Sequence, residues 1–264
     1  MRIALGLEYD GSRFCGWQSQ PAGCGVQDAL ESSLAAMAGC AIRVSAAGRT
    51  DTGVHAMMQV VHFDTGTDRP LGAWVRGVNS RLPDSVRVLW ACPVSEQFHA
   101  RFSARRRSYE YLLVNQPVRP ALLLGKAGWF HQPLDVAAMQ AAARHLLGEH
   151  DFSAFRAAGC QAKSPVKTLF QAGVRRHGSA IVFRFSAGAF LHHQVRNMVG
   201  ALVYVGKGSF APEWIADLVR ARDRTQAPPT FSPDGLYLAG VEYDAGWQLP
   251  QTARSLADLT LPAG

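Results

Sequence analysis

The segment best suited to chemistry is residues 46–56, which holds an acid, Asp51, and a base, Arg49, between two glycines, Gly48 and Gly53. The runs on either side alternate or favour β structure, so the pattern predicts a turn between two strands. The glycines allow the backbone to turn tightly on both sides of the acid. A carboxylate held on a stiff turn can act as a nucleophile or base. It can equally be a turn-maker that accepts hydrogen bonds from nearby backbone N–H groups.

A second candidate is Arg196, which lies within a helical pattern over residues 190–205 that looks largely buried. A buried arginine needs an acidic partner, because an unpaired buried charge is very costly. Asp51 would suit this role, since a bidentate guanidinium keeps a carboxylate ionised and oriented. The alternative is that Arg196 reaches solvent or a backbone carbonyl, and the sequence leaves both open.

Two further candidates lie at strand starts. Tyr109 follows a run of arginines, and Leu236 follows Gly235 beside a proline-rich loop. A tyrosine on a strand is by default a core or interface residue. In a cleft, the same ring could stack on a base and offer its hydroxyl for proton transfer.

The elements that must position these residues alternate between helices and strands. A helical pattern begins at Val26 and stops at Gly39, residues 169–175 and 180–186 indicate a hairpin, and residues 236–243 indicate a closing strand. We expect an α+β fold with two sandwich-like domains, each with an antiparallel sheet. The helices should lie on the outer faces, and the domains should meet at a central basic cleft.

A basic, aromatic stretch at residues 98–107 marks the expected domain boundary. The predicted domains are residues 1–104, carrying the Asp51 loop, and residues 105–245, followed by a mobile tail at 246–264. The stretch itself is either a solvated linker or a surface that grips phosphates. No dinucleotide or P-loop glycine motif is present, which argues against a nucleotide cofactor.

The composition fits a globular cytoplasmic protein. The chain has 264 residues, 48% hydrophobic and 18% charged, and no apolar run approaches the ~20 residues that cross a bilayer. The net charge of +7 makes nucleic acid a plausible partner, and a high-GC genome is an alternative explanation for the excess of arginine. The five cysteines are odd in number and lack C-x-x-C spacing, which argues against a disulfide framework and a zinc site.

Residues 48–56, GRTDTGVHA, resemble the signature loop of the TruA family of tRNA pseudouridine synthases. Further stretches are similar to motifs of that family, in the same order along the chain. They are residues 9–12 (YDGS), 16–18 (GWQ), 98–104 (FHARFSA), 190–200 (FLHHQVRNMVG) and 235–238 (GLYL).

This resemblance implies an isomerase that converts uridine to pseudouridine at nucleotides 38, 39 and 40, in the anticodon arm of tRNA. It also implies a homodimer with no metal or organic cofactor. By the same resemblance, Asp51 is the nucleophile and Arg196 its partner. Tyr109 stacks on the target base, Leu236 packs beside it, and Arg49 holds or replaces the flipped nucleotide.

Two other functions remain open from the residues alone. A non-catalytic RNA-binding module explains the basic character but not an acid on an exposed turn, which would repel phosphates. A carboxylate-dependent hydrolase needs a second acid or a metal. Glu8 and Asp10 are candidates for that acid, but their spacing to Asp51 is unconvincing.

Overall fold

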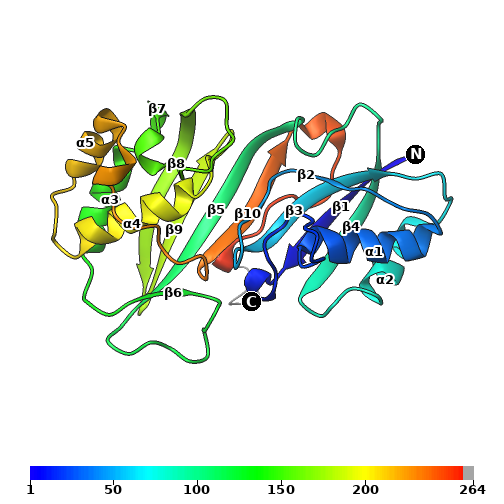
Figure 1. The fold of residues 1–264 in the computed structure, drawn as a ribbon, viewed down its shortest axis with the longest axis horizontal. Helices are drawn as coiled ribbons and strands as arrows, with labels where there is room; N and C mark the ends of the chain where they lie inside the picture. Colours follow the sequence, from blue (N-terminus) through cyan, green and yellow to red (C-terminus); the bar gives the residue numbers. More distant parts are fainter. Residues whose placement is uncertain (258–264) are drawn as a thin grey trace. The chain divides into compact units, whose positions relative to one another are not determined.

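The computed structural model describes residues 1–257, which form two compact units (Figure 1). The first unit contains Met1–Arg107 and the segment that begins at Tyr237, and the second contains Ser108–Leu236. The chain passes from the first unit to the second within one strand, β5 (Ala104–Asn115), and returns at the start of another, β10 (Leu236–Tyr243).

The first unit is a sheet covered by two helices. Its strands besides β10 are β1 (Arg2–Tyr9), β2 (Ser45–Ala46), β3 (His55–Asp64) and β4 (Val86–Val94). The order is β4-β1-β3-β10, with β2 also on β3. Strand β1 is antiparallel to β3 and β4, whereas β10 is parallel to β3. The strand β3 is buried along nearly its whole length, so it forms the centre of the sheet.

The helices of the first unit are α1 (Val26–Ala38) and α2 (Leu71–Asn79), with short 3-10 turns η1 (Gly11–Arg13) and η4 (Ala245–Trp247). Helix α1 packs against α2, which packs against β4. The predicted stop of α1 is confirmed, because Gly39 takes a left-handed conformation with φ 74° that other residues rarely adopt.

The second unit is likewise built from β-strands and helices. Its strands besides β5 are β6 (Gly128–Phe130), β7 (Gly148–Asp151), β8 (Val166–His177) and β9 (Ala180–Ala187). Strands β8 and β9 form the expected antiparallel hairpin. The helices are α3 (Val136–Arg144), α4 (Gln194–Gly206) and α5 (Trp214–Ala221), with 3-10 turns η2 (Ser153–Phe155) and η3 (Arg224–Gln226). Helix α3 contacts β8, α4 and α5, so the helices form one layer.

Helices with mostly antiparallel strands agree with the predicted α+β class. The division of the chain differs from the predicted 104/105 boundary and from a second domain that runs to residue 245. The reason is long-range pairing: Tyr237 and Leu238 of β10 lie beside His55 and Ala56 of β3. A strand from the end of the chain thereby joins the first unit.

The segment that follows β10 is folded as far as it is described. Trp247 packs its ring 5.3 Å from that of Phe98, and the Arg254 amide donates to the Ala239 carbonyl. The last residues of the predicted mobile tail, 258–264, lie outside the described part of the chain. No helix among residues 1–257 has the length and apolarity needed to cross a bilayer.

The argument against disulfides is wrong for one pair of cysteines. Cys15 and Cys24 form a disulfide with their Cα atoms 5.4 Å apart. The loop between them folds back, and the Cys15 amide donates a 2.9 Å hydrogen bond to the Cys24 carbonyl. This local pairing, which an odd cysteine count does not reveal, brings the two sulfurs together.

Candidate active site

Asp51 lies on the predicted turn, directly before β3. Its carbonyl accepts a 3.1 Å hydrogen bond from the Val54 amide, and Gly53 has a φ of 77° at the third position of this turn. That conformation favours glycine, as expected. Gly48 has no positive φ, and a Cβ there would meet open space, so only one of the two glycines is required by the turn. Asp51 is half-buried and Arg49 is exposed.

Three contacts from other elements hold this turn. The Trp17 amide donates to the Thr50 carbonyl at 2.9 Å, and the Thr50 and Tyr9 hydroxyls are 2.8 Å apart in a buried hydrogen bond. The Gln59 side-chain amide donates to the Gly48 carbonyl at 2.7 Å. Burial raises the pKa of Tyr9 above its usual range, so its hydroxyl keeps its proton. The backbone on the N-terminal side of Asp51 is therefore fixed by its surroundings.

The loop before α1 packs against the turn at very short range. A Cβ on Gly11 would lie 1.9 Å from the Val54 carbonyl oxygen, and one on Gly16 would lie 2.8 Å from that of Thr50. Gly16 also has a φ of 94°. Both positions therefore require glycine, one for space and one for space and conformation.

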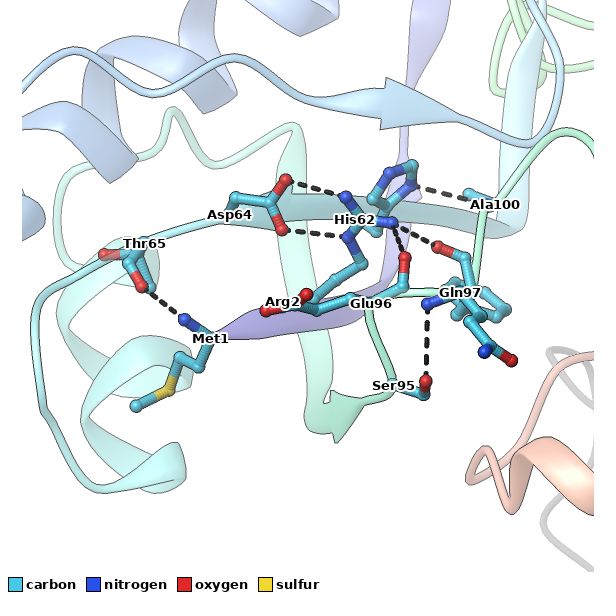
Figure 2. A network of polar contacts seen from close by, with 10 residues as sticks. Met1, Arg2, His62, Asp64, Thr65, Ser95, Glu96, Gln97 and Ala100 are labelled. Atoms are coloured by element: carbon cyan, nitrogen blue, oxygen red, sulfur yellow. Dashed lines mark hydrogen bonds and ion pairs between the residues drawn. The ribbon is translucent and has the colours of Figure 1, made fainter.

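Arg107 connects the Asp51 turn to a second loop of the same unit, formed by residues 98–103. Its guanidinium donates to the Ala47 carbonyl at 2.9 Å and to the Arg101 carbonyl at 2.6 Å. Arg2 holds the start of that loop by donating to the Phe98 carbonyl at 2.9 Å. A bidentate pair with Asp64, which Figure 2 shows, in turn fixes the Arg2 guanidinium. The loop is therefore anchored both to the end of the β1–β3 pair, where Arg2 lies opposite Asp64, and to the Asp51 turn.

In the second unit, Tyr109 lies on β5 and is half-buried. Its ring meets that of Phe190 edge to face, with centroids 5.2 Å apart and planes at 89°. This arrangement is favourable for aromatic pairs and fixes the orientation of the tyrosine ring.

Arg196 lies in the first turn of α4 and is half-buried. Its Nε donates a 2.8 Å hydrogen bond to the Phe231 carbonyl. The helix begins at Gln194, later than the predicted residue 190, because His193 caps it with a left-handed φ of 61°. A backbone carbonyl is thus one partner of this arginine, which was one of the alternatives left open by the sequence.

Leu236 is buried, with 5% of its surface exposed, at the end of a tightly packed loop. The Leu112 amide donates to the Gly235 carbonyl at 2.8 Å. A Cβ on Gly235 would lie 2.2 Å from the Leu112 carbonyl oxygen. The ring of Phe231 in the same loop lies 5.8 Å from that of Tyr111. The loop therefore connects α4 with β5 and so relates the positions of Arg196, Leu236 and Tyr109 within this unit.

The structure thus places Asp51 and Arg49 in the first unit and Tyr109, Arg196 and Leu236 in the second. Sequence reasoning missed the residues that hold the Asp51 turn, chiefly Tyr9, Trp17 and Arg107. Tyr9 and Trp17 belong to motifs of the family resemblance, and Arg107 belongs to the arginine run. The motifs and the arginine run indicated that these three residues are important, but they did not reveal that the residues contact the Asp51 turn.

Known proteins resemble the chain over nearly all of its length. The family model described as tRNA pseudouridine synthase matches residues 7–103 and 142–244. This chain belongs to the tRNA pseudouridine synthase family. Membership confirms the family expected from the motifs and the expected class of enzyme.

Individual relatives agree. A protein of Methylobacillus flagellatus named tRNA pseudouridine synthase A is 67% identical over 97% of this chain and 98% of its own. Proteins of the same name from Dechloromonas aromatica and Thiobacillus denitrificans are 62% and 59% identical. These cover 95% and 96% of this chain and 95% and 97% of their own lengths.

Proposed function

We propose that this chain isomerises uridine to pseudouridine at nucleotides 38, 39 and 40 in the anticodon stem-loop of tRNA, with Asp51 as the nucleophile. The family and the names of relatives support the reaction and the class of substrate. The observation that carries the role of Asp51 is its rigid turn, fixed by Thr50 and Gly53. A preorganised carboxylate loses little freedom when it attacks the substrate.

The reaction breaks the bond between N1 of the base and C1′ of the ribose. The base then rotates, a C5–C1′ bond forms, the C5 hydrogen leaves as a proton, and N1 takes up a proton. Nothing is oxidised or reduced, so the reaction needs no outside reagent. Asp51 can start it by attacking C1′, by attacking C6, or by removing the 2′ proton, and each route needs an ionised carboxylate.

We assign the other residues by their surroundings in the second unit. Tyr109, with its ring fixed against Phe190, stacks on the target base. Arg196 pairs with Asp51 during the reaction and keeps it ionised. Leu236 packs beside the base, and exposed Arg49 holds or replaces the flipped nucleotide. Flipping is required because C1′ and C5 are inaccessible in a stacked stem.

We also infer that the protein works in the cytoplasm as a homodimer, without a metal or organic cofactor. Light scattering at working concentration tests the dimer. Turnover on tRNA that has been folded beforehand, with a chelator and monovalent salt present, tests the metal requirement. Activity that is lost in chelator and restored by one divalent ion would contradict the inference.

The decisive experiment compares Asp51→Asn with Asp68→Asn, the same change at an exposed carboxylate of the same unit. Release of the C5 hydrogen from labelled tRNA measures turnover, and chemical mapping of pseudouridine locates the product. We expect Asp51→Asn to abolish turnover while tRNA affinity stays within a few-fold, and Asp68→Asn to be unaffected. Substantial turnover by Asp51→Asn would exclude the nucleophile role.

The same assay separates the alternative, a non-catalytic RNA-binding module. Such a protein would bind tRNA and release no C5 hydrogen even as the unaltered chain. Product outside the anticodon arm would instead leave the chemistry intact and overturn the assignment of nucleotides 38, 39 and 40.

A further inference from the structure

Phe102 is an exposed aromatic residue in an otherwise well-held loop. It leaves 75% of its surface in solvent, within the loop formed by residues 98–103, between β4 and β5. Arg101 beside it is also exposed, and its guanidinium carbon lies 5.6 Å from the Phe102 ring centre. The His99 ring lies 4.3 Å from the Phe102 ring at an angle of 35°.

The 98–103 loop is rigid, because buried groups hold it along its length. The Ala100 amide donates to His62 Nδ1 at 3.1 Å, and the Tyr243 hydroxyl donates to the Ala100 carbonyl at 2.7 Å. Figure 2 shows the first of these contacts beside the Arg2–Asp64 pair. The loop also closes on itself, since the Ser103 amide donates to the His99 carbonyl at 2.8 Å.

Because the loop is rigid, the exposure of the Phe102 ring is a fixed feature of the surface and is not caused by fraying of the loop. The amides of Arg101 and Phe102 both point at His99 Nδ1, at 3.1 and 3.4 Å, which fixes the backbone beneath the ring. Burial lowers the pKa of His99, with the Arg2 charge adding to this effect, so the imidazole is neutral at pH 7. The ring beside Phe102 is therefore an aromatic neighbour and not a second cation.

Arg101 stands apart from the other arginines of the basic stretch. Arg105 pairs with Asp244 at 2.8 Å, Arg106 lies 3.6 Å from Glu242, and Arg107 donates to backbone carbonyls. Among residues 1–257, no acidic side chain forms an ion pair with Arg101. Its charge is thus available next to an exposed aromatic ring, and that combination fits a nucleotide with its base and its phosphate.

We propose that Phe102 is a stacking platform for an unpaired base of the RNA substrate, and that Arg101 contacts the phosphate next to that base. The proposal rests on the function proposed above. The occupant is a nucleobase because a flat, sequence-tolerant π surface beside a guanidinium matches a single-stranded nucleotide. Arg107 joins this loop to the Asp51 turn, so the platform holds the RNA at a fixed place relative to the catalytic acid.

The test measures the affinity of Phe102→Ala and Phe102→Trp for an unmodified tRNA transcript and for a fully paired RNA duplex. The matched control is Leu122→Ala, which removes a side chain that is 98% exposed in the second unit. We expect Phe102→Ala to weaken tRNA binding by roughly five-fold to a hundred-fold, the effect of one stacked base. Phe102→Trp should restore binding, and Leu122→Ala and the duplex should show no change.

Salt dependence and fluorescence identify the contact. Because stacking is not ionic, Phe102→Ala should lower affinity by the same factor at low and high salt. Arg101→Gln should reduce the slope of log affinity against log salt by about 0.7 to 0.9, the contribution of one phosphate. The Phe102→Trp variant has one more tryptophan than the unaltered protein. When tRNA is added, the fluorescence of this extra tryptophan should be quenched, and the midpoint of quenching should equal the midpoint of tRNA binding.

Three results would overturn the proposal. The first is unchanged tRNA affinity in Phe102→Ala. The second is an equal loss on the duplex, which would show a general effect on the fold. The third is a changed oligomeric state by light scattering, which would make the ring a subunit contact. Each differs from failure of the proposed function, in which the unaltered protein releases no C5 hydrogen from tRNA.

Discussion

The two units hold their candidate site residues by different forces. In the first, hydrogen bonds from Tyr9, Trp17 and Gln59 fix the backbone around Asp51. In the second, an aromatic edge orients Tyr109, and Gly235 packs tightly beneath Leu236. Directional bonds fix position closely, whereas apolar contacts tolerate small shifts. Disturbing the backbone around Asp51 should therefore reduce kcat, and disturbing the aromatic packing around Tyr109 should mainly raise KM.

The largest effect is expected from Gly16→Ala. The new Cβ would lie 2.8 Å from the Thr50 carbonyl oxygen, at a φ of 94°. Left-handed strain and overpacking together should lower the free energy of unfolding by about 3 kcal/mol. Because Thr50 must move, turnover should fall more than ten-fold with tRNA affinity nearly unchanged. Urea denaturation and single-turnover assays measure the two effects.

Gly23→Ala is the matched control for that substitution. Gly23 also has a positive φ, 65°, but a Cβ there would meet nothing within 4 Å. It should therefore show only the strain, about 1 kcal/mol, with normal turnover. Equal effects at the two glycines would mean that the contact with Thr50 does not matter.

The next effect is the dependence of stability on pH, through His62 in the first unit. This imidazole accepts a hydrogen bond from the Ala100 amide, and burial lowers its pKa to about 4, with His99 and Arg2 adding to the shift. The unfolded chain takes up the proton near the ordinary pKa of 6.5. Stability is therefore full above pH 6.5 and is lost as the pH falls toward 4, by up to about 3 kcal/mol.

Urea denaturation at pH 7, 5.5 and 4.5 measures this loss. His62→Gln keeps an acceptor for the Ala100 amide but does not titrate. The variant should be less sensitive to pH than the unaltered protein over this range, while carboxylates contribute equally to both. Parallel curves for the two proteins would show that His62 is not the group responsible.

The sequence reveals what is local and misses what is distant. The turn at Asp51 and the stop of α1 follow from Gly53 and Gly39, whose conformations depend on neighbouring residues. The pairing of Tyr237 with His55 joins residues far apart in the chain, so the periodicity of apolar residues within a segment cannot predict it. The prediction that the helix begins at residue 190 is wrong, because His193 adopts a left-handed conformation that favours glycine and α4 begins only after it.

The candidate site shows the same division. Asp51 could be proposed from its own loop, but the contacts that hold it come from Tyr9 and Arg107, some forty to sixty positions away. In the basic stretch, composition predicted a surface that binds phosphates or a solvated linker. It could not show that Arg107 anchors loops while Arg101 faces solvent.

A smaller effect is expected in the second unit from Phe190→Leu. The change removes the aromatic edge from Tyr109 but keeps an apolar side chain. The pair contributes about 0.5–1.5 kcal/mol, so KM should rise by about two-fold to ten-fold with kcat within two-fold. Phe210→Leu, which removes a ring stacked 3.8 Å from Trp214, is the control and should leave KM unchanged. A fall in kcat alone would mean that Tyr109 acts on the chemistry and not on base binding.

The smallest effect is expected from Arg105→Gln. Arg105 and Asp244 form a bidentate pair, but both side chains are exposed, and such pairs contribute little to stability. The urea midpoint should not move measurably. Because Asp244 already neutralises Arg105, the salt slope of tRNA binding should change less than in Arg101→Gln. Asp244→Asn should make the salt slope of tRNA binding steeper, since it frees the Arg105 guanidinium to contact a phosphate. A slope in Arg105→Gln as shallow as in Arg101→Gln would show that RNA displaces Asp244, so that the whole stretch binds phosphates.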